Sequence, residues 1–281
     1  MSEALSDLSS KDIVTLASES FCEQGRPLVM LHGFSQNRHV WRSIAETISR
    51  RLLRPISIDL RGHGDSGWSP ERRYQLDDYA RDLPTALDAI GLDRVILVAH
   101  SLGGHAATLF AAQHPERVEG LVLVDTGPNL SIAALTQIAN DTESALDSFE
   151  SVEGYRRWLG AQLPRADPDA LADFAPRCIV RRLDGRFELK LDPGILNPSA
   201  GAGDWQAMEQ RLEDALRQIR CPTLLVRGGL SAVLPEPVAK HICETLLRNG
   251  QLHTLERAGH AVMLEDGPQL CRVIESFAET L

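Results

Sequence analysis

The sequence predicts an α/β fold with a doubly wound, mostly parallel sheet. Short runs that are mostly apolar recur along the chain, as is typical of strands buried on both faces of a parallel sheet. They lie at 28–31, 55–60, 95–98, 121–124 and 223–226, and a more polar final strand is expected at 251–255. A short alternating run at 13–16 predicts an edge strand. Segments with apolar residues at helical spacing separate these runs, and we expect helices at about 40–51, 79–90, 208–219 and 268–281.

Composition limits the classes of partner. The length of 281 residues allows one large α/β domain or a core with an inserted subdomain, and the hydrophobic fraction of 43% is enough for a substantial core. Its 29 basic and 39 acidic residues give a net charge of −10, which argues against nucleic acid and anionic membrane as partners. The charge says nothing about a small-molecule substrate, which is the partner expected from the function predicted below. The balance does not decide between a monomer and a homodimer.

The cysteine positions and the first residues give no sign of a metal site or of a targeting segment. The five cysteines are scattered singly, without the paired spacing of zinc or redox sites, so we expect reduced, buried thiols: Cys22, Cys178, Cys221, Cys243 and Cys271. The function predicted below implies no metal or organic cofactor. Residues 1–11 are polar and acidic, and no run is long enough to span a bilayer. A cytoplasmic protein is the expectation.

The stretch around Ser101 carries the strongest chemical signal. The run 95–98 leads into Ala99, the serine and two glycines, Gly103 and Gly104, and an alanine-rich segment follows. This order predicts a strand, a sharp turn and a helix, with small neighbours because strand and helix nearly touch. The turn holds the serine in a strained conformation, so that its hydroxyl lies above the sheet.

This stretch resembles the nucleophile elbow of the α/β-hydrolase superfamily, Gly-x-Ser-x-Gly, with Ala99 in place of the first glycine. The resemblance covers nearly the whole chain. It implies that Ser101 is the nucleophile. It also implies that the backbone N–H groups of Phe34, which follows His32-Gly33 at the end of a strand, and of Leu102 form the oxyanion hole.

A second string is still more specific to that superfamily. Residues 59–66 read Asp-Leu-Arg-Gly-His-Gly-Asp-Ser, which is similar to its Asp-x-Arg-Gly-His-Gly-x-Ser loop. The resemblance implies a structural role for this loop beside the active site. We therefore interpret Asp59, Arg61 and His63 as scaffold residues.

The resemblance also implies a histidine base and a carboxylate partner. His260 follows a glycine after the last strand, where the superfamily places its general base. The superfamily usually places the acid after its seventh strand, here the run 223–226, but that position holds Ser231, which is neutral. Ser231 ends an Arg-Gly-x-x-Ser string that is similar to a subset of the superfamily, and this subset takes its acid from the end of the sixth strand, here the run 121–124. Asp125 ends that sixth strand and is the predicted acid; Glu236 is the alternative.

The segment after Asp125 differs from the rest of the chain. From about residue 129 to 203, helical stretches are interrupted by prolines, and the resemblance implies a helical cap inserted after the sixth strand. The predicted organisation is a core at 1–128, the cap at 129–203 and the core again at 204–281. Candidate substrate contacts are His32, His100, Trp158, Phe174 and Phe187. The cap arginines, among them Arg156, Arg157, Arg181 and Arg182, either clamp a substrate carboxylate or, with acidic neighbours, form surface pairs.

The predicted function is hydrolysis of a small carboxylic ester, lactone, thioester or amide through an acyl-enzyme on Ser101, with His260 as base and Asp125 as its orienting acid. Three alternatives remain. A C–C bond hydrolase or perhydrolase would use the same residues. A cofactor-free dioxygenase would use only the His260/Asp125 dyad. A receptor-like module would bind a small ligand without turnover.

Overall fold

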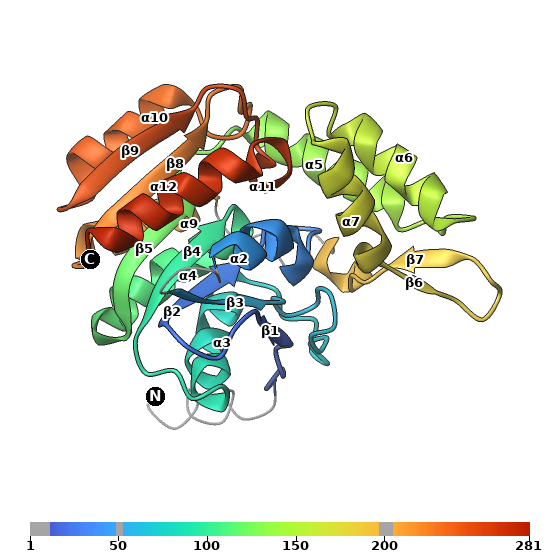
Figure 1. Ribbon diagram of the computed structural model, residues 1–281, viewed down its shortest axis with the longest axis horizontal. Helices are drawn as coiled ribbons and strands as arrows, with labels where there is room; N and C mark the ends of the chain where they lie inside the picture. The colour runs from blue at the N-terminus through green and yellow to red at the C-terminus, as the bar shows by residue number, and fades with distance from the viewer. Residues whose placement is uncertain (1–11, 49–52, 197–204) are drawn as a thin grey trace.

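A seven-stranded, mostly parallel sheet organises the computed structural model, which describes residues 12–48, 53–196 and 205–281 (Figure 1). Its order is β1-β3-β2-β4-β5-β8-β9, and only β1 is antiparallel to its neighbour. This confirms the predicted fold class. The strands are β1 (Ser18–Ser20), β2 (Arg26–Leu31), β3 (Leu53–Ile58), β4 (Val95–His100), β5 (Val118–Val124), β8 (Thr223–Gly228) and β9 (Gly250–Leu255).

Helices cover both faces of the sheet. One face packs on α2 (Arg42–Ile48), α11 (Val262–Glu265) and α12 (Gly267–Glu279). The other packs on α3 (Leu76–Ala89), α4 (Leu102–Gln113), α9 (Trp205–Gln218), α10 (Glu236–His241) and the π-helical turn η4 (Ile242–Leu246). The helix expected at 40–51 begins with the 3₁₀ turn η1 (Arg38–Trp41), and its expected end lies outside the described residues.

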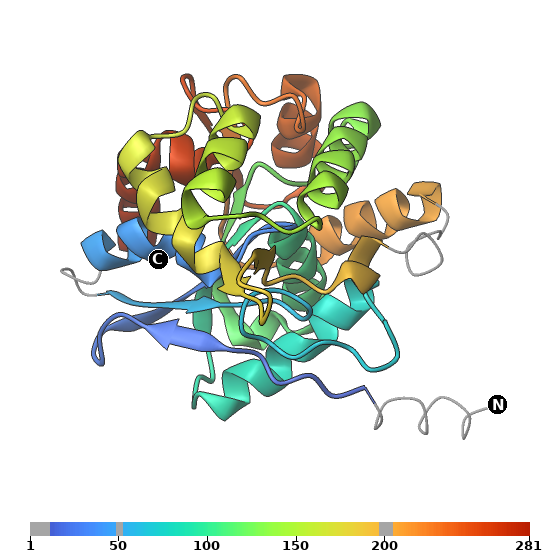
Figure 2. The ribbon, with the colours of Figure 1, turned by 90° about the vertical axis from the view of Figure 1, so that its right-hand side faces the viewer.

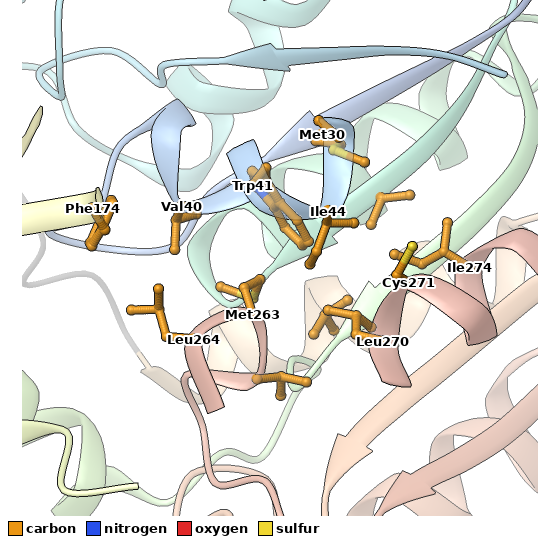
Figure 3. Packing of buried hydrophobic residues seen from close by; sticks show 14 of the residues in the cluster. Met30, Val40, Trp41, Ile44, Phe174, Met263, Leu264, Leu270, Cys271 and Ile274 are labelled. Atoms are coloured by element: carbon orange, nitrogen blue, oxygen red, sulfur yellow. The ribbon is translucent and has the colours of Figure 1, made fainter. Parts of the chain in front are cut away.

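Successive strand residues alternate between the two helix layers. Leu28 and Met30 of β2 join the cluster on the α2/α12 side, whereas Val29 and Leu31 join the cluster on the α3/α4 side. Figure 3 shows the cluster on the α2/α12 side, in which Trp41 packs between the sheet and the last two helices, α11 and α12. Because helices bury both faces, most of the parallel strands read as largely apolar runs, which is why the sequence reveals them; β9 (Gly-Gln-Leu-His-Thr-Leu) is the exception.

The strand order reverses between β2 and β4. From β2 the chain moves outward to β3, and from β4 it moves outward in the opposite direction through β5, β8 and β9. The crevice at such a switch point, beyond the carboxyl ends of the strands, is where open α/β sheets bind ligands. Phe34 and Ser101 follow these two strands.

The edge strand differs from the expected one. Residues 13–16 were expected to form it, but β1 (Ser18–Ser20) pairs with β3 instead. The segment just before β1 bonds to the loop 59–67: Gly67 N–H donates to the Thr15 carbonyl and Ala17 N–H donates to Ser66 Oγ. That backbone is therefore engaged with the loop rather than with a strand.

The segment between β5 and α9 gathers at one side of the molecule (Figures 1 and 2). It contains α5 (Ile132–Ala145), α6 (Val152–Gln162), α7 (Pro168–Cys178) and the 3₁₀ turn η3 (Pro193–Leu196). It also contains an antiparallel hairpin of β6 (Ile179–Arg181) and β7 (Phe187–Leu189), which the sequence did not predict. The predicted boundary at 203/204 lies outside the described residues, as does the polar segment 1–11.

Two further expectations are answered by the described residues. No disulfide joins any of the five cysteines, all of which lie in described residues, but only Cys178 and Cys271 are buried and the other three lie in partly exposed positions. Among the described helices, none combines the length and the apolar character that crossing a bilayer requires.

Candidate active site

Ser101 occupies a strained turn between β4 and α4. Its φ is 49° and its ψ is −118°, a left-handed conformation that is uncommon for a residue with a side chain. A Cβ on Gly103 would lie 2.5 Å from the His32 carbonyl oxygen, and one on Gly104 would lie 2.2 Å from Thr126 Cγ2. The two glycines therefore allow α4 to start directly above the sheet, and the serine faces the cavity described below.

His260 lies beside this serine, in the loop between β9 and α11. Its Nε2 is 3.2 Å from Ser101 Oγ, and its Nδ1 is 2.7 Å from Asp125 Oδ2. When Nδ1–H donates to the carboxylate, Nε2 is free to accept the serine proton. The structure therefore brings Ser101, His260 and Asp125 into one hydrogen-bonded line.

Asp125 is fully buried just after β5, with a φ of 47°. Its Oδ1 accepts the Gly228 N–H at 2.9 Å, and its Oδ2 accepts the Ser231 hydroxyl at 2.5 Å as well as the imidazole. A buried carboxylate needs such donors, because desolvation would otherwise favour its neutral form. Ser231, which fills the usual acid position, thus touches the carboxylate that faces His260.

Glu236, the alternative acid, lies on the exposed surface of α10. Its side chain is 56% exposed in the first turn of α10 and pairs with Lys240 at 2.7 Å. Negative charge at a helix N-terminus is favourable, which explains a glutamate there without catalysis. The carboxylate that contacts His260 is that of Asp125.

The two predicted oxyanion donors flank Ser101 in the cavity wall, since Phe34 and Leu102 both line it. Leu102 is the first residue of α4, so its N–H has no acceptor within the helix. The backbone of the turn after β2 lies close to the end of β4, because a Cβ on Gly33 would lie 2.6 Å from His100 Nδ1. Gln36, which the sequence did not single out, braces this turn, because its Oε1 accepts the Gly33 N–H and lies 3.1 Å from His100 Nδ1.

A cavity of about 910 Å³ opens over these residues. Its wall is built from the core and from α5, α6, α7 and α9, and three predicted contacts, His100, Trp158 and Phe174, line it. Helix α5 also contributes to the wall, which was not predicted: Ile132, Leu135 and Ile138, spaced three residues apart, line the cavity. Their spacing was the available signal, but it is equally typical of ordinary helix packing.

Two predicted contacts do not line the cavity. His32 is fully buried below it; its Nδ1 donates to the Gly33 carbonyl and its Nε2 accepts the Leu60 N–H at 2.9 Å. Burial lowers the pKa of His32 to about 4, so the ring is neutral and part of the scaffold. Phe187 lies in the hairpin, where its backbone pairs with Phe149.

The loop 59–66 forms a buried network of charges beside the site. The Asp59 carboxylate accepts the backbone N–H groups of Arg38 and Asp65 and pairs with the Arg38 guanidinium. The Arg61 guanidinium is buried between Asp12 and Asp82. These contacts agree with the scaffold interpretation of the loop. No cluster with three or more possible metal ligands occurs in the described parts of the chain.

Comparisons with known proteins give the family. The family model for the alpha/beta hydrolase fold matches residues 26–267. A 2-(acetamidomethylene)succinate hydrolase from Mesorhizobium japonicum is 28% identical over 210 residues, which are 75% of this chain and 73% of that protein. The sn-1-specific diacylglycerol lipase ABHD11 of Mus musculus is 28% identical over 261 residues, which are 89% of this chain and 80% of that protein.

A solved structure agrees. The crystal structure of E-2-(acetamidomethylene)succinate hydrolase matches with a TM-score of 0.82 at 24% identity, covering 95% of this chain and 96% of that one. At this identity the likeness shows the fold. With the family match over most of the chain and relatives named as hydrolases, the chain belongs to the α/β-hydrolase fold family and is an enzyme of that family.

Proposed function

We propose that this protein hydrolyses a small-molecule carboxylic ester through an acyl-enzyme on Ser101, with lactones, thioesters and amides as related substrates. The observation that carries the proposal is the line from Asp125 Oδ2 through His260 to Ser101 Oγ, with distances of 2.7 and 3.2 Å, at the floor of a large cavity. Such a line is the arrangement that activates a serine hydroxyl.

In the first half-reaction, Ser101 Oγ attacks the ester carbonyl carbon while His260 Nε2 takes the hydroxyl proton. The N–H groups of Phe34 and Leu102 stabilise the oxyanion, each contributing roughly 3 kcal/mol in a site of this kind. The tetrahedral intermediate then collapses. The bond to the leaving oxygen breaks, that oxygen receives the proton from His260, and an alcohol departs.

In the second half-reaction, a water molecule attacks the acyl carbon and gives its proton to His260. The second tetrahedral intermediate expels Ser101 Oγ, which recovers the proton, and the carboxylic acid is released. Throughout, Asp125 holds the imidazole with Nδ1 protonated and stabilises the imidazolium. The Ser231 hydroxyl and the Gly228 N–H hold Asp125 in turn, with the distances given above.

The segment at about 129–203 acts in this proposal as a cap. Helices α5, α6 and α7 supply much of the cavity wall, whereas the reacting groups come from the ends of core elements. A cap of this kind excludes water from the reaction and selects the substrate by its shape.

Acyl-enzyme trapping tests the proposal. The protein is mixed with a p-nitrophenyl ester, quenched in acid and digested, and the peptide that contains Ser101 is weighed. We expect that peptide to gain the mass of the acyl group in the wild type, and Ser101→Ala to lose both the adduct and p-nitrophenol release.

Ser131→Ala is the matched control, because Ser131 also lines the cavity but lies at the start of α5. It should keep the adduct on Ser101. Turnover without an adduct in the wild type would contradict the acyl-enzyme and favour a reaction that uses only the His260/Asp125 dyad. Binding without turnover would favour a receptor.

A further inference from the structure

The cavity around Ser101 is walled mainly by apolar side chains. Trp158, Leu159, Phe174, Leu264 and Met208 line it, from four different elements. A surface of this kind gains free energy when it is covered by hydrocarbon, at about 25 cal/mol for each Å² removed from water. The wall therefore favours a substrate with an apolar body.

The cavity wall contains few charged side chains. Among the described lining residues, the one arginine or lysine is Arg165. Its guanidinium lies 3.1 Å from the carboxylate of Glu265, which is only 3% exposed and also accepts the Gly259 N–H. A second carboxylate, that of Asp141, also lines the wall. The positive charge of Arg165 is thus already compensated, and the wall offers an anion no unpaired cation.

The histidines of the wall do not change this balance. Burial lowers the pKa of His100 well below its ordinary value and also lowers the pKa of His105. Both rings are therefore neutral at pH 7. His260 also lines the wall, but its Nδ1 is already paired with the carboxylate of Asp125.

The four arginines that the sequence analysis considered as a clamp do not line the cavity. Arg156 pairs with Glu153 and Arg182 pairs with Asp184 and Glu188, in exposed positions. Arg157 and Arg181 are exposed as well, and none of the four lines the cavity. The carboxylate clamp considered from the sequence is therefore absent from the described residues.

We propose that the substrate carries a neutral, apolar acyl group and that a carboxylate on the acyl chain is rejected. This rests on the proposed ester hydrolysis at Ser101. An acyl carboxylate would lose its water in the cavity and find no free cation there, because Arg165 is already paired with Glu265, and the Asp141 carboxylate would repel it.

A matched pair of substrates tests the inference in the wild-type protein. p-Nitrophenyl valerate and mono-p-nitrophenyl glutarate share the reacting ester and chain, but a methyl group ends the first and a carboxylate ends the second. We expect kcat/KM to favour the valerate by about 100-fold. A preference of at least tenfold supports the inference, and a smaller or reversed preference overturns it.

A charge variant tests the stated cause. Glu265→Gln keeps an oxygen to accept the Gly259 N–H but leaves Arg165 uncompensated, so the ratio of glutarate to valerate kcat/KM should rise by about tenfold. Adding Arg165→Gln in the same protein should return the ratio to the wild-type value. An unchanged ratio in Glu265→Gln would overturn the assignment of the rejection to this pair.

The same experiments distinguish a failure of the proposed ester hydrolysis from a failure of the inference on the acyl group. If neither ester is cleaved and Ser101 acquires no acyl group, the proposed ester hydrolysis fails. If both esters acylate Ser101 with similar kcat/KM, ester hydrolysis stands and the inference on the acyl group fails.

Discussion

At the scale of single residues, the carboxylate of Asp125 is held in place by several hydrogen bonds. It is buried completely, and it accepts hydrogen bonds from a backbone N–H, a serine hydroxyl and the His260 ring. Charge-assisted hydrogen bonds of this kind are stronger than neutral ones, and several of them fix an orientation as well as a charge. Asp125 therefore holds the imidazole in place through a carboxylate that is itself held.

Asp125→Asn should lower turnover of a p-nitrophenyl ester by about four orders of magnitude, because an amide favours the wrong imidazole tautomer. Glu236→Gln is the matched control: it removes a carboxylate that is exposed and paired with Lys240, and its turnover should stay near that of the wild type. Steady-state rates at pH 7.5 are the measurement. Retained activity in Asp125→Asn together with loss in Glu236→Gln would place the acid after β8.

Ser231→Ala should lower kcat by about tenfold with little change in KM, because it removes a hydroxyl that bonds Asp125 Oδ2 at 2.5 Å but does not line the cavity. Ser231→Thr keeps a hydroxyl and should recover most of the rate. Kinetic constants of the three proteins are compared on one ester. Equal loss in the alanine and threonine variants would mean that the loop had merely been disturbed.

The positions of the site residues were predictable from sequence to the extent that they follow strands. Ser101, Asp125 and His260 each lie just beyond a strand, and a parallel sheet brings such residues to one edge. The contact between Ser231 and Asp125, 106 residues apart, depends on how two loops meet, and no local pattern encodes it. His32 and Phe187 were misplaced for the same reason: side-chain direction after a strand depends on tertiary contacts.

At the scale of elements, the buried strands were predictable and the marginal ones were not. Five of the six parallel strands consist largely of apolar residues, because helices cover both faces. β1 is the polar triplet Ser-Glu-Ser at the edge of the sheet, and the hairpin strands β6 and β7 have three residues each. Backbone pairing maintains these strands, and their side chains carry little sequence signal.

Helix α6 should set acyl-chain preference through Trp158, which lines the cavity. Trp158→Ala should shift the preference among p-nitrophenyl esters of increasing chain length, and it should change the acetate rate less than about threefold, since the acetyl group is too short to reach far from Ser101. Phe187→Ala is the control, because Phe187 does not line the cavity. An equal fall on every ester in Trp158→Ala would indicate a destabilised segment instead.

At the scale of the whole molecule, buried neutral histidines tie stability to pH. Burial lowers the pKa of His32 to about 4 and that of His63 to about 3, against about 6.5 for an exposed histidine. Between pH 6.5 and 4, the unfolded chain therefore binds protons that the folded protein does not. The free energy of unfolding must fall as the pH falls through this range, and it is unaffected by these two groups above pH 7.

For His32 alone, this linkage amounts to about 2 kcal/mol between pH 7 and 4.5. His32→Gln keeps an acceptor for the Leu60 N–H but does not titrate. From pH 7 to pH 4.5, the free energy of unfolding should therefore fall by about 2 kcal/mol more in the wild type than in this variant. Urea denaturation at the two pH values gives both drops. Equal drops in the variant and the wild type would show that His32 contributes no proton linkage.

The central claim is that Ser101 is an activated nucleophile, and covalent labelling measures this most directly. The folded protein is treated with a fluorophosphonate probe, digested and mapped by peptide mass spectrometry, with His260→Ala as the comparison. We predict one adduct, on Ser101, that forms rapidly in the wild type and at least about 100-fold more slowly in His260→Ala, because the imidazole takes the serine proton. An unmodified Ser101 in folded wild-type protein, or labelling at the same rate without His260, would contradict the claim.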